Sequence, residues 1–311
     1  MFEIKQPSQI IIGENSSKKF QFPENCLVIT SSGNKKRKWL EHIEIENFML
    51  FEDVEPNPSI ETTKKIIEKF SKEEISCIIG LGGGSSLDVS KFVAHKLEKK
   101  KFLIPTTFGS GSEVTRIAVL SVDGKKTSFH DDSMFADVAI IDPFFVQNTP
   151  INIIKNSAID ACAQCTEGFD SKLGNPYTKF LCNTAFNILE SALLNEKYES
   201  LPLGSLISGL GFGNSSTTLG HALSYVFSNE GYSHGHALAF TTQFAHKFNS
   251  SQYTSRFEKI VQYLDFEKIY LKQNLSDAAD LILQDHKHLD YNPKVITKEE
   301  IIEILEKINL L

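Results

Sequence analysis

The sequence predicts an α/β nucleotide-binding domain, Rossmann-like with a mostly parallel sheet, followed by an all-α helical domain. Three observations support this fold class. Short apolar runs alternate with helical segments in the first half of the chain, and two turns rich in glycine and hydroxyl residues follow strands there. Beyond Thr149-Pro150 the apolar residues follow helical periodicity alone. We therefore assign residues 1–148 to the first domain and 149–311 to the second.

The alternation in the first half comes from short, β-branched apolar runs separated by polar segments. Strands are expected at 26–30, 48–54, 102–107 and 137–143, and another leads into the glycine turn at 80–91. Between the second and third runs, residues 59–73 read as a helix. Ser59 is a suitable cap, and Ile66, Ile67 and Phe70 recur at helical spacing.

Composition excludes several classes of protein. The chain has 311 residues, 41% of them hydrophobic and 23% charged, as in ordinary soluble proteins. A formal net charge of −7 argues against nucleic-acid binding, and no run approaches the ~18 apolar residues of a membrane span. The five cysteines form no regular framework, which indicates a cytoplasmic protein with reduced thiols. Cys162 and Cys165 fall inside a predicted helix, where core packing is favoured over redox chemistry.

The turn GLGGGSSLDVSK (80–91) is the first candidate for cofactor binding. Glycines let a backbone approach a ligand closely, and the N–H groups at the start of the next helix favour a phosphate. Gly82, Gly83, Gly84 and Ser85 are therefore expected at a pyrophosphate. A tight turn that lets strand and helix pack closely explains the same glycines about equally well.

A second loop, IPTTFGSGSEVT (104–115), follows the next strand and favours the cofactor interpretation. Ligands of open α/β sheets lie beyond the carboxyl ends of the strands. Thr106, Thr107 and Ser110 can donate hydrogen bonds to a phosphate, a ribose or a nicotinamide amide. A polar turn with local caps is the less favoured alternative.

The residues after the strand at 26–30 bear on the choice of nicotinamide cofactor. An acidic side chain there would hold the ribose of NAD and repel the extra phosphate of NADP. Ser31 and Ser32 occupy this position, followed by Lys35, Lys36 and Arg37. We expect NADPH at least to compete with NADH.

The second half contains a candidate metal site. In the predicted helix SAIDACAQCTEGFDS (157–171), Asp160 and Gln164 are four residues apart and share one face. His221 and His234 are separated by a loop that would place them at the end of one helix and the start of the next. An Asp/His/His set can hold a divalent cation with an open position. Packing of these histidines in a core remains the alternative.

Taken together, these segments resemble the iron-containing (group III) alcohol dehydrogenase family over most of the chain. The resemblance is carried by DVEPNPS, IIGLGGGSSLDVSK, IPTTFGSGSEVT, VAIIDP, AIDACAQCTEG and GHALSY…SHGHALA, in the family's order. The resemblance implies reversible NAD(P)-dependent interconversion of an alcohol with an aldehyde or ketone. It also favours a homodimer and an aldehyde or alcohol substrate.

The resemblance assigns further residues and shows two departures from the pattern. It places Asp88 at the pyrophosphate loop, Lys126 near the cofactor, and Asp160, His221 and His234 at metal-ligand positions. Gln164 and Tyr225 stand where iron-binding members often have histidines. Relatives with only Asp/His/His bind zinc, so a divalent metal, Fe2+ or Zn2+, is favoured over an empty site, with Gln164 as a hydrogen-bonding neighbour. Tyr225, His236 or water is expected to supply the proton.

Only a weaker sequence similarity bears on the choice of substrate. The spacing around Gln164 and DGKKTSFHDD is similar to phosphonoacetaldehyde reductases, which make 2-hydroxyethylphosphonate. Such an anion would need Arg116 and Lys125 or Lys126. Arg116 also resembles a position in sugar-acid oxidoreductases. A degenerate nucleotide binder without catalysis and a cyclase of the dehydroquinate-synthase type remain alternatives.

Overall fold

The computed structural model describes residues 1–311 and divides into two compact units, Lys5–Thr149 and Pro150–Leu311 together with Met1–Ile4. The first unit is built on a parallel sheet and the second contains only helices. The predicted fold class is therefore confirmed. No helix has the length and unbroken apolar character needed to cross a lipid bilayer.

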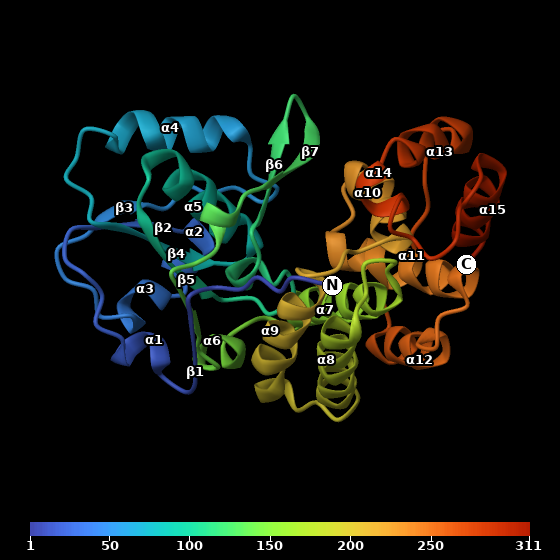
Figure 1. The fold of residues 1–311 in the computed structure, drawn as a ribbon, viewed down its shortest axis with the longest axis horizontal. Coiled ribbons are helices and arrows are strands. Elements are labelled where there is room, and N and C mark those ends of the chain that lie inside the picture. Colours follow the sequence, from blue (N-terminus) through green and yellow to red (C-terminus); the bar gives the residue numbers. More distant parts are fainter. The chain divides into compact units, whose positions relative to one another are not determined.

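The sheet of the first unit has six parallel strands in the order β1-β8-β5-β4-β2-β3 (Figure 1). They are β1 (Gln9–Ile12), β2 (Cys26–Ile29), β3 (Met49–Phe51), β4 (Cys77–Gly82), β5 (Lys100–Pro105) and β8 (Val138–Ile141). A separate antiparallel hairpin consists of β6 (Ile117–Val122) and β7 (Lys125–His130). Strand β1 and this hairpin were not predicted from the sequence.

Helices cover both faces of the sheet, as the βα alternation requires. They are α1 (Ser16–Lys19), α2 (Ser32–Lys36), α3 (Trp39–His42), α4 (Ile60–Phe70), α5 (Gly84–Leu97) and α6 (Phe144–Gln147), with short 3-10 turns η1 (Ser112–Val114) and η2 (Asp132–Met134). Figure 1 shows α4 and α5 on one face and α1 and α6 on the other. The predicted cap of α4 is present, because the Ser59 hydroxyl accepts from Thr62 N at 3.2 Å.

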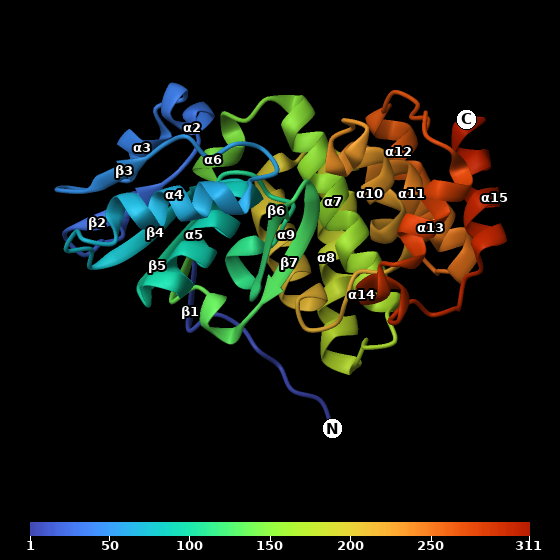
Figure 2. The same ribbon diagram turned by 90° about the horizontal axis from the view of Figure 1, so that it is seen from above.

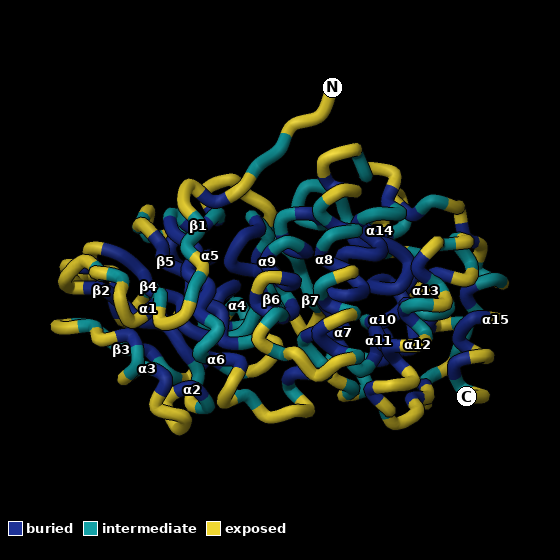
Figure 3. Tube along the Cα trace, turned by 90° about the horizontal axis from the view of Figure 1, so that it is seen from below, coloured by how far each residue is buried: buried dark blue, intermediate teal, exposed yellow.

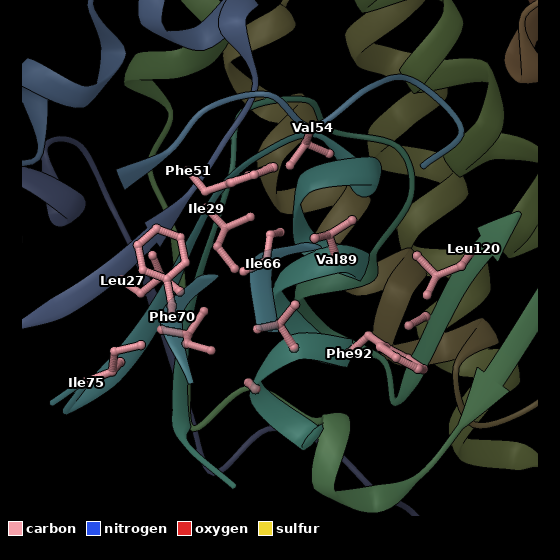
Figure 4. Close-up of a cluster of buried hydrophobic side chains, with 14 of the residues drawn as sticks. Leu27, Ile29, Phe51, Val54, Ile66, Phe70, Ile75, Val89, Phe92 and Leu120 are labelled. Carbon is pink, nitrogen blue, oxygen red and sulfur yellow. The ribbon is translucent and has the colours of Figure 1, made fainter. Parts of the chain in front are cut away.

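The core of this unit lies between the sheet and the pair α4 and α5. Leu27 and Ile29 of β2, Ile66 of α4 and Val89 of α5 belong to one buried apolar cluster (Figure 4). Strands β2 and β4 are buried along their whole length (Figure 3). Burial on both faces explains why these strands are continuous apolar runs instead of alternating ones.

A buried ionic network on α5 holds the segment that follows β5. Lys91 is fully buried, donates to the carbonyl oxygens of Ser112 (2.9 Å) and Ile117, and lies 3.2 Å from Asp88 Oδ1. Asp88 in turn accepts from Ser112 Oγ at 2.6 Å and from Val119 N at 3.0 Å. The two charges compensate each other, which a buried ion requires. Together they fix η1 and the start of β6.

The second unit consists of helices throughout, and its main elements are visible in Figure 2. They are α7 (Ile151–Asp170), α8 (Pro176–Leu194), α9 (Leu201–Phe212), α10 (Leu219–Asn229), α11 (His234–Asn249), α12 (Thr254–Leu264), α13 (Leu275–Leu283), α14 (His286–Leu289) and α15 (Lys298–Asn309), with the 3-10 turn η3 (Tyr198–Ser200). Cys162 and Cys165 are fully buried on α7, and burial raises the pKa of the Cys165 thiol, which confirms core packing.

The buried carboxyl of Glu113 in η1 gives the first unit a testable pH dependence. Burial raises the pKa of Glu113 to about 7 from the ordinary 4.5. The folded state then binds more protons than the unfolded state between these values, so stability falls as pH rises from about 4.5 to 7. We expect the free energy of unfolding to lose roughly 2 kcal/mol over this window because of Glu113.

Glu113→Gln should remove that part of the loss, and the exposed Glu68→Gln should not. Urea denaturation at pH 5 and pH 7 measures the difference between each variant and the wild type. Identical pH slopes in the wild type and Glu113→Gln would contradict the assignment.

Candidate metal and cofactor sites

Three helices bring Asp160, His221 and His234 together. Asp160 comes from α7, His221 from α10 and His234 from the first position of α11. One ligand atom from each lies within 4.8 Å of the others. Asp160 Oδ1 is 3.7 Å from His221 Nε2 and 3.9 Å from His234 Nε2. The three candidates from the sequence are thus neighbours in space.

Glycine allows the helices to approach closely enough for this. A Cβ at Gly235 would lie only 1.9 Å from the Asn156 carbonyl oxygen of α7. A side chain there would push the start of α11, and His234 with it, away from α7. Gly220 has the same function on α10, because a Cβ there would lie 2.7 Å from Glu167 Oε1.

Glu167 fixes the orientation of His221. Its buried carboxylate accepts from His221 Nδ1 at 2.5 Å, from Gly220 N at 2.5 Å and from Thr218 N at 3.2 Å. Burial opposes ionisation of Glu167, but the His221 charge and these donors outweigh it and lower its pKa to about 2. Because Nδ1 is held by the carboxylate, the ring presents Nε2 toward Asp160. Glu167 was not predicted from the sequence, although it lies one helical turn beyond Gln164.

Gln164 and Tyr225 both lie beside the three candidate ligands. Gln164 Nε2 donates to Asp160 Oδ1 at 3.0 Å, so this side chain orients the carboxylate. The Tyr225 ring is 6.1 Å from the His234 ring and nearly parallel to it. Burial raises the pKa of the Tyr225 hydroxyl, which therefore keeps its proton at neutral pH.

His236, one of the three candidates for the proton donor, has other partners in the structure. Its Nε2 binds the Glu267 carbonyl oxygen at 2.5 Å, and its ring packs against Phe266 and Tyr232. His236 lies two residues after His234 on α11, and this spacing turns its side chain to a different face of the helix.

Another histidine, absent from the sequence predictions, lies near the site instead. His288 of α14 is buried, and its ring is 6.0 Å from that of His221 and 5.6 Å from that of Tyr225. The Asp285 carboxylate oxygens are 2.8 and 2.7 Å from His288 Nδ1. The spacing of Asp285 and His288 was a visible clue, but only the fold brings α14 next to α10.

The chemistry of the donor set fits a divalent cation. One carboxylate and two imidazoles are common ligands of Zn2+ and Fe2+, and His221 has the carboxylate partner that metal-binding histidines usually have. Asp160, His221 and His234 would hold the ion.

The candidate cofactor loops of the first unit also lie next to each other. A Cβ at Gly83 would lie 2.9 Å from Thr107 Oγ1, and one at Gly84 would lie 3.0 Å from Ser110. Gly84 and Ser85 are the first residues of α5, whose N-terminus has no side-chain cap. Its first N–H groups are therefore suited to a phosphate.

Packing explains part of the glycine pattern. Gly82 has φ 155°, and a Cβ there would lie 2.6 Å from Ser86 Oγ and 2.8 Å from Asn34 Nδ2. Asn34 donates to the Leu81 carbonyl at 3.0 Å and so ties the loop after β2 to the end of β4. Close packing therefore accounts for Gly82, and cofactor binding remains a prediction for Gly83, Gly84 and Ser85.

The other residues predicted to bind the cofactor lie at separate places in the first unit. Thr106 is buried, and its Oγ1 is 3.5 Å from Asn34 Oδ1. Asp88 does not face the turn as a free carboxylate, because Ser112, Val119 and Lys91 occupy its oxygens. Lys126 is half-buried on β7. Ser31 precedes α2 as its N-cap residue.

The chain matches known proteins along most of its length. The family model "Iron-containing alcohol dehydrogenase" matches residues 7–143, and "Fe-containing alcohol dehydrogenase family, C-terminal" matches residues 154–284. A long-chain-alcohol dehydrogenase 1 of Geobacillus thermodenitrificans is 30% identical over 254 residues, covering 72% of this chain and 64% of that protein. An NADPH-dependent butanol dehydrogenase of Clostridium saccharobutylicum is 27% identical, covering 91% of this chain and 78% of that protein.

The fold is shared with solved structures. That of the sulfoacetaldehyde reductase from Bifidobacterium kashiwanohense, in complex with NAD+, superposes with a TM-score of 0.88 at 22% identity, covering 99% of both chains. With both family models matched in order over the two units described above, the chain belongs to the iron-containing alcohol dehydrogenase family.

Proposed function

We propose that this chain is a metal-dependent NAD(P)H oxidoreductase that interconverts a small alcohol and its aldehyde. The observation that carries the proposal is the convergence of Asp160, His221 and His234 to within 4.8 Å from three different helices. The same chain carries two adjacent loops suited to a dinucleotide, Gly82–Ser85 and Thr106–Ser110. A degenerate binding protein has no need to keep both the donor set and its Glu167 support.

The reaction needs charge stabilisation at the substrate oxygen. A divalent cation held by Asp160, His221 and His234 would act as a Lewis acid there, and the nicotinamide would supply or accept the hydride. Glu167 holds His221 Nδ1, so Nε2 is the nitrogen that would bind the cation. Gln164 restrains the Asp160 carboxylate in the same way.

Tyr225 and His288 are the candidates for contacting the reacting oxygen and its proton. The Tyr225 hydroxyl keeps its proton and can donate a hydrogen bond. His288 is held at Nδ1 by Asp285, which leaves Nε2 for a substrate atom. This arrangement repeats the one at His221, where a carboxylate also fixes Nδ1.

The choice of substrate rests on charge. Phosphonoacetaldehyde, the finer hypothesis from the sequence, requires cations to hold its phosphonate. Arg116 is already paired with Asp132, with Nη1 2.7 Å from Oδ1, and Asp132 also binds Lys5. The same pairing weakens the case for a sugar acid. We therefore favour an uncharged aldehyde.

The test combines metal analysis with a substrate panel. Protein purified without chelator should contain close to one equivalent of Fe or Zn, and NADPH oxidation should be followed with short aldehydes, phosphonoacetaldehyde and a sugar-acid aldehyde. Turnover of the uncharged aldehydes supports the proposal. A protein without metal and without turnover of any aldehyde would be a degenerate family member.

His234→Ala should separate the metal site from the cofactor site. Loss of one of three donors should lower metal content at least tenfold and turnover by on the order of 100-fold. NADPH binding, measured by fluorescence, should stay unchanged because its candidate loops lie in the other unit. His236→Ala, two residues along the same helix, is the matched control and should keep its metal. Full metal occupancy in His234→Ala would refute the ligand assignment.

His288→Ala tests the second histidine. We expect kcat to fall by roughly 10–100-fold with the metal content unchanged, because the residue contacts substrate and not the ion. The exposed His286→Ala on the same short helix is the control. Loss of metal in His288→Ala, or full activity, would remove it from the substrate site.

The cofactor preference follows from the loop after β2. Ser31 and Ser32 carry no charge, and exposed Lys36 is available for a 2′-phosphate, since Lys35 pairs with Glu52 at 2.7 Å. We expect kcat/KM for NADPH to equal or exceed that for NADH. Ser32→Asp should shift the ratio about tenfold toward NADH, whereas the same charge at exposed Ser71 should not. A wild-type preference for NADH would contradict this.

A further inference from the structure

Two cysteines outside the proposed catalytic site lie in a position to react with each other. Cys26 is the first residue of β2 and Cys77 the first residue of β4. These strands are neighbours in the sheet, and Cys26 is directly opposite Cys77 in their register. Their sulfur atoms are 2.8 Å apart.

The distance between the two sulfur atoms lies between the length of a disulfide bond and that of an ordinary non-bonded contact. Non-bonded heavy atoms prefer about 3.5–4.0 Å, whereas a disulfide bond is about 2.05 Å long. Neighbouring strands place paired Cα atoms about 4.7–4.9 Å apart, which falls inside the range of about 4.4–6.8 Å that disulfides span. The pairing of Cys26 with Cys77 therefore agrees with the Cα separation that a disulfide needs.

We propose that Cys26 and Cys77 are a redox-active thiol pair that forms a disulfide between β2 and β4. The oxidant is a low-molecular-weight disulfide. One cysteine thiolate attacks it, forming a mixed disulfide and releasing one small thiol. The second cysteine thiolate attacks the protein sulfur of that mixed disulfide, forming the Cys26–Cys77 bond and releasing the second small thiol. Two electrons pass from the pair to the oxidant, and the two thiol protons leave with the released thiols or the buffer.

The surroundings of the pair allow this reaction. Both side chains are buried, but they sit at the amino ends of their strands beside exposed Pro23 and Ser76. In the reduced protein the Cys26 thiol donates to the Pro23 carbonyl at 2.7 Å. Local opening of this turn gives a small reagent access without unfolding the sheet.

The other three cysteines are unsuited to the reaction. Cys162 and Cys165 lie inside helix α7 and Cys182 lies inside helix α8, whereas Cys26 and Cys77 lie at strand ends next to an exposed turn. Opening of these helices would be needed before a reagent could reach the three thiols. They serve as internal controls.

The cross-link would join β4, which leads into the glycine turn, to β2, which leads to Ser31. These candidate cofactor residues follow the carboxyl ends of β2 and β4, whereas the cysteines are at the amino ends. We therefore expect a gain in stability with little change in cofactor binding. The bond closes a loop between residues 51 apart in sequence, and restriction of the unfolded chain by such a loop corresponds to a rise in melting temperature on the order of 10 °C.

The experiment is thiol counting before and after treatment of the full-length protein with oxidised glutathione. Alkylation in denaturant should label five thiols in the reduced protein and three after oxidation, with peptide mapping showing Cys26 linked to Cys77. The melting temperature should rise in the oxidised wild type and not in Cys26→Ser or Cys77→Ser. Cys182→Ser should still form the bond.

Three results would overturn the proposal. They are five labelled thiols after oxidation, a linkage that involves another cysteine, and a stable glutathione adduct on Cys26 with Cys77 still free. Mapping of the wild type decides between these outcomes even if a serine variant folds poorly. The assay uses no substrate or metal, so its outcome is independent of the proposed oxidoreductase activity.

Discussion

The buried carboxylate of Glu167 is the interaction on which the candidate metal site depends. It accepts hydrogen bonds from His221 Nδ1 and from the N–H groups of Thr218 and Gly220, at the start of α10. A single side chain of α7 thus places α10, selects the nitrogen that His221 presents and supports its basicity. An unpaired buried carboxylate would be costly, so the helix start and the histidine must stay together.

The first unit uses a comparable device at a different place. Lys91 and Asp88, both on α5, hold the segment after β5 through buried charge-assisted hydrogen bonds. This fixes the second candidate cofactor loop against the glycine turn, where Gly83 meets Thr107. In both units a buried ion pair positions residues suited to ligand binding. Because the ion pairs fix the backbone, the groups expected to bind ligands do not have to be held in place by packing of their own side chains.

His221 and His288 share one design, an imidazole with Nδ1 fixed by a carboxylate. Their different surroundings separate their proposed roles. His221 faces Asp160 Oδ1 at 3.7 Å and joins the donor set, whereas His288 is outside that set but within 6.0 Å of the His221 ring. The same pair of residue types, a histidine and a carboxylate, can thus supply one metal ligand and one contact to the substrate.

The fold class, two candidate cofactor loops and three metal-ligand candidates could be predicted from the sequence, because these depend on local periodicity, on glycine and on residue type. The hairpin β6–β7 and strand β1 were not predicted from the sequence. Strand β1 is short and partly exposed, and it pairs with β8, which lies far along the chain. Three contacts could be seen only in the tertiary structure. His236 binds the Glu267 carbonyl, and Asp88 contacts Lys91 and Ser112. Asp285 and His288 lie beside Tyr225. Helical spacing gives the face of a residue on its own helix, but which helix packs against that face depends on contacts distant in sequence.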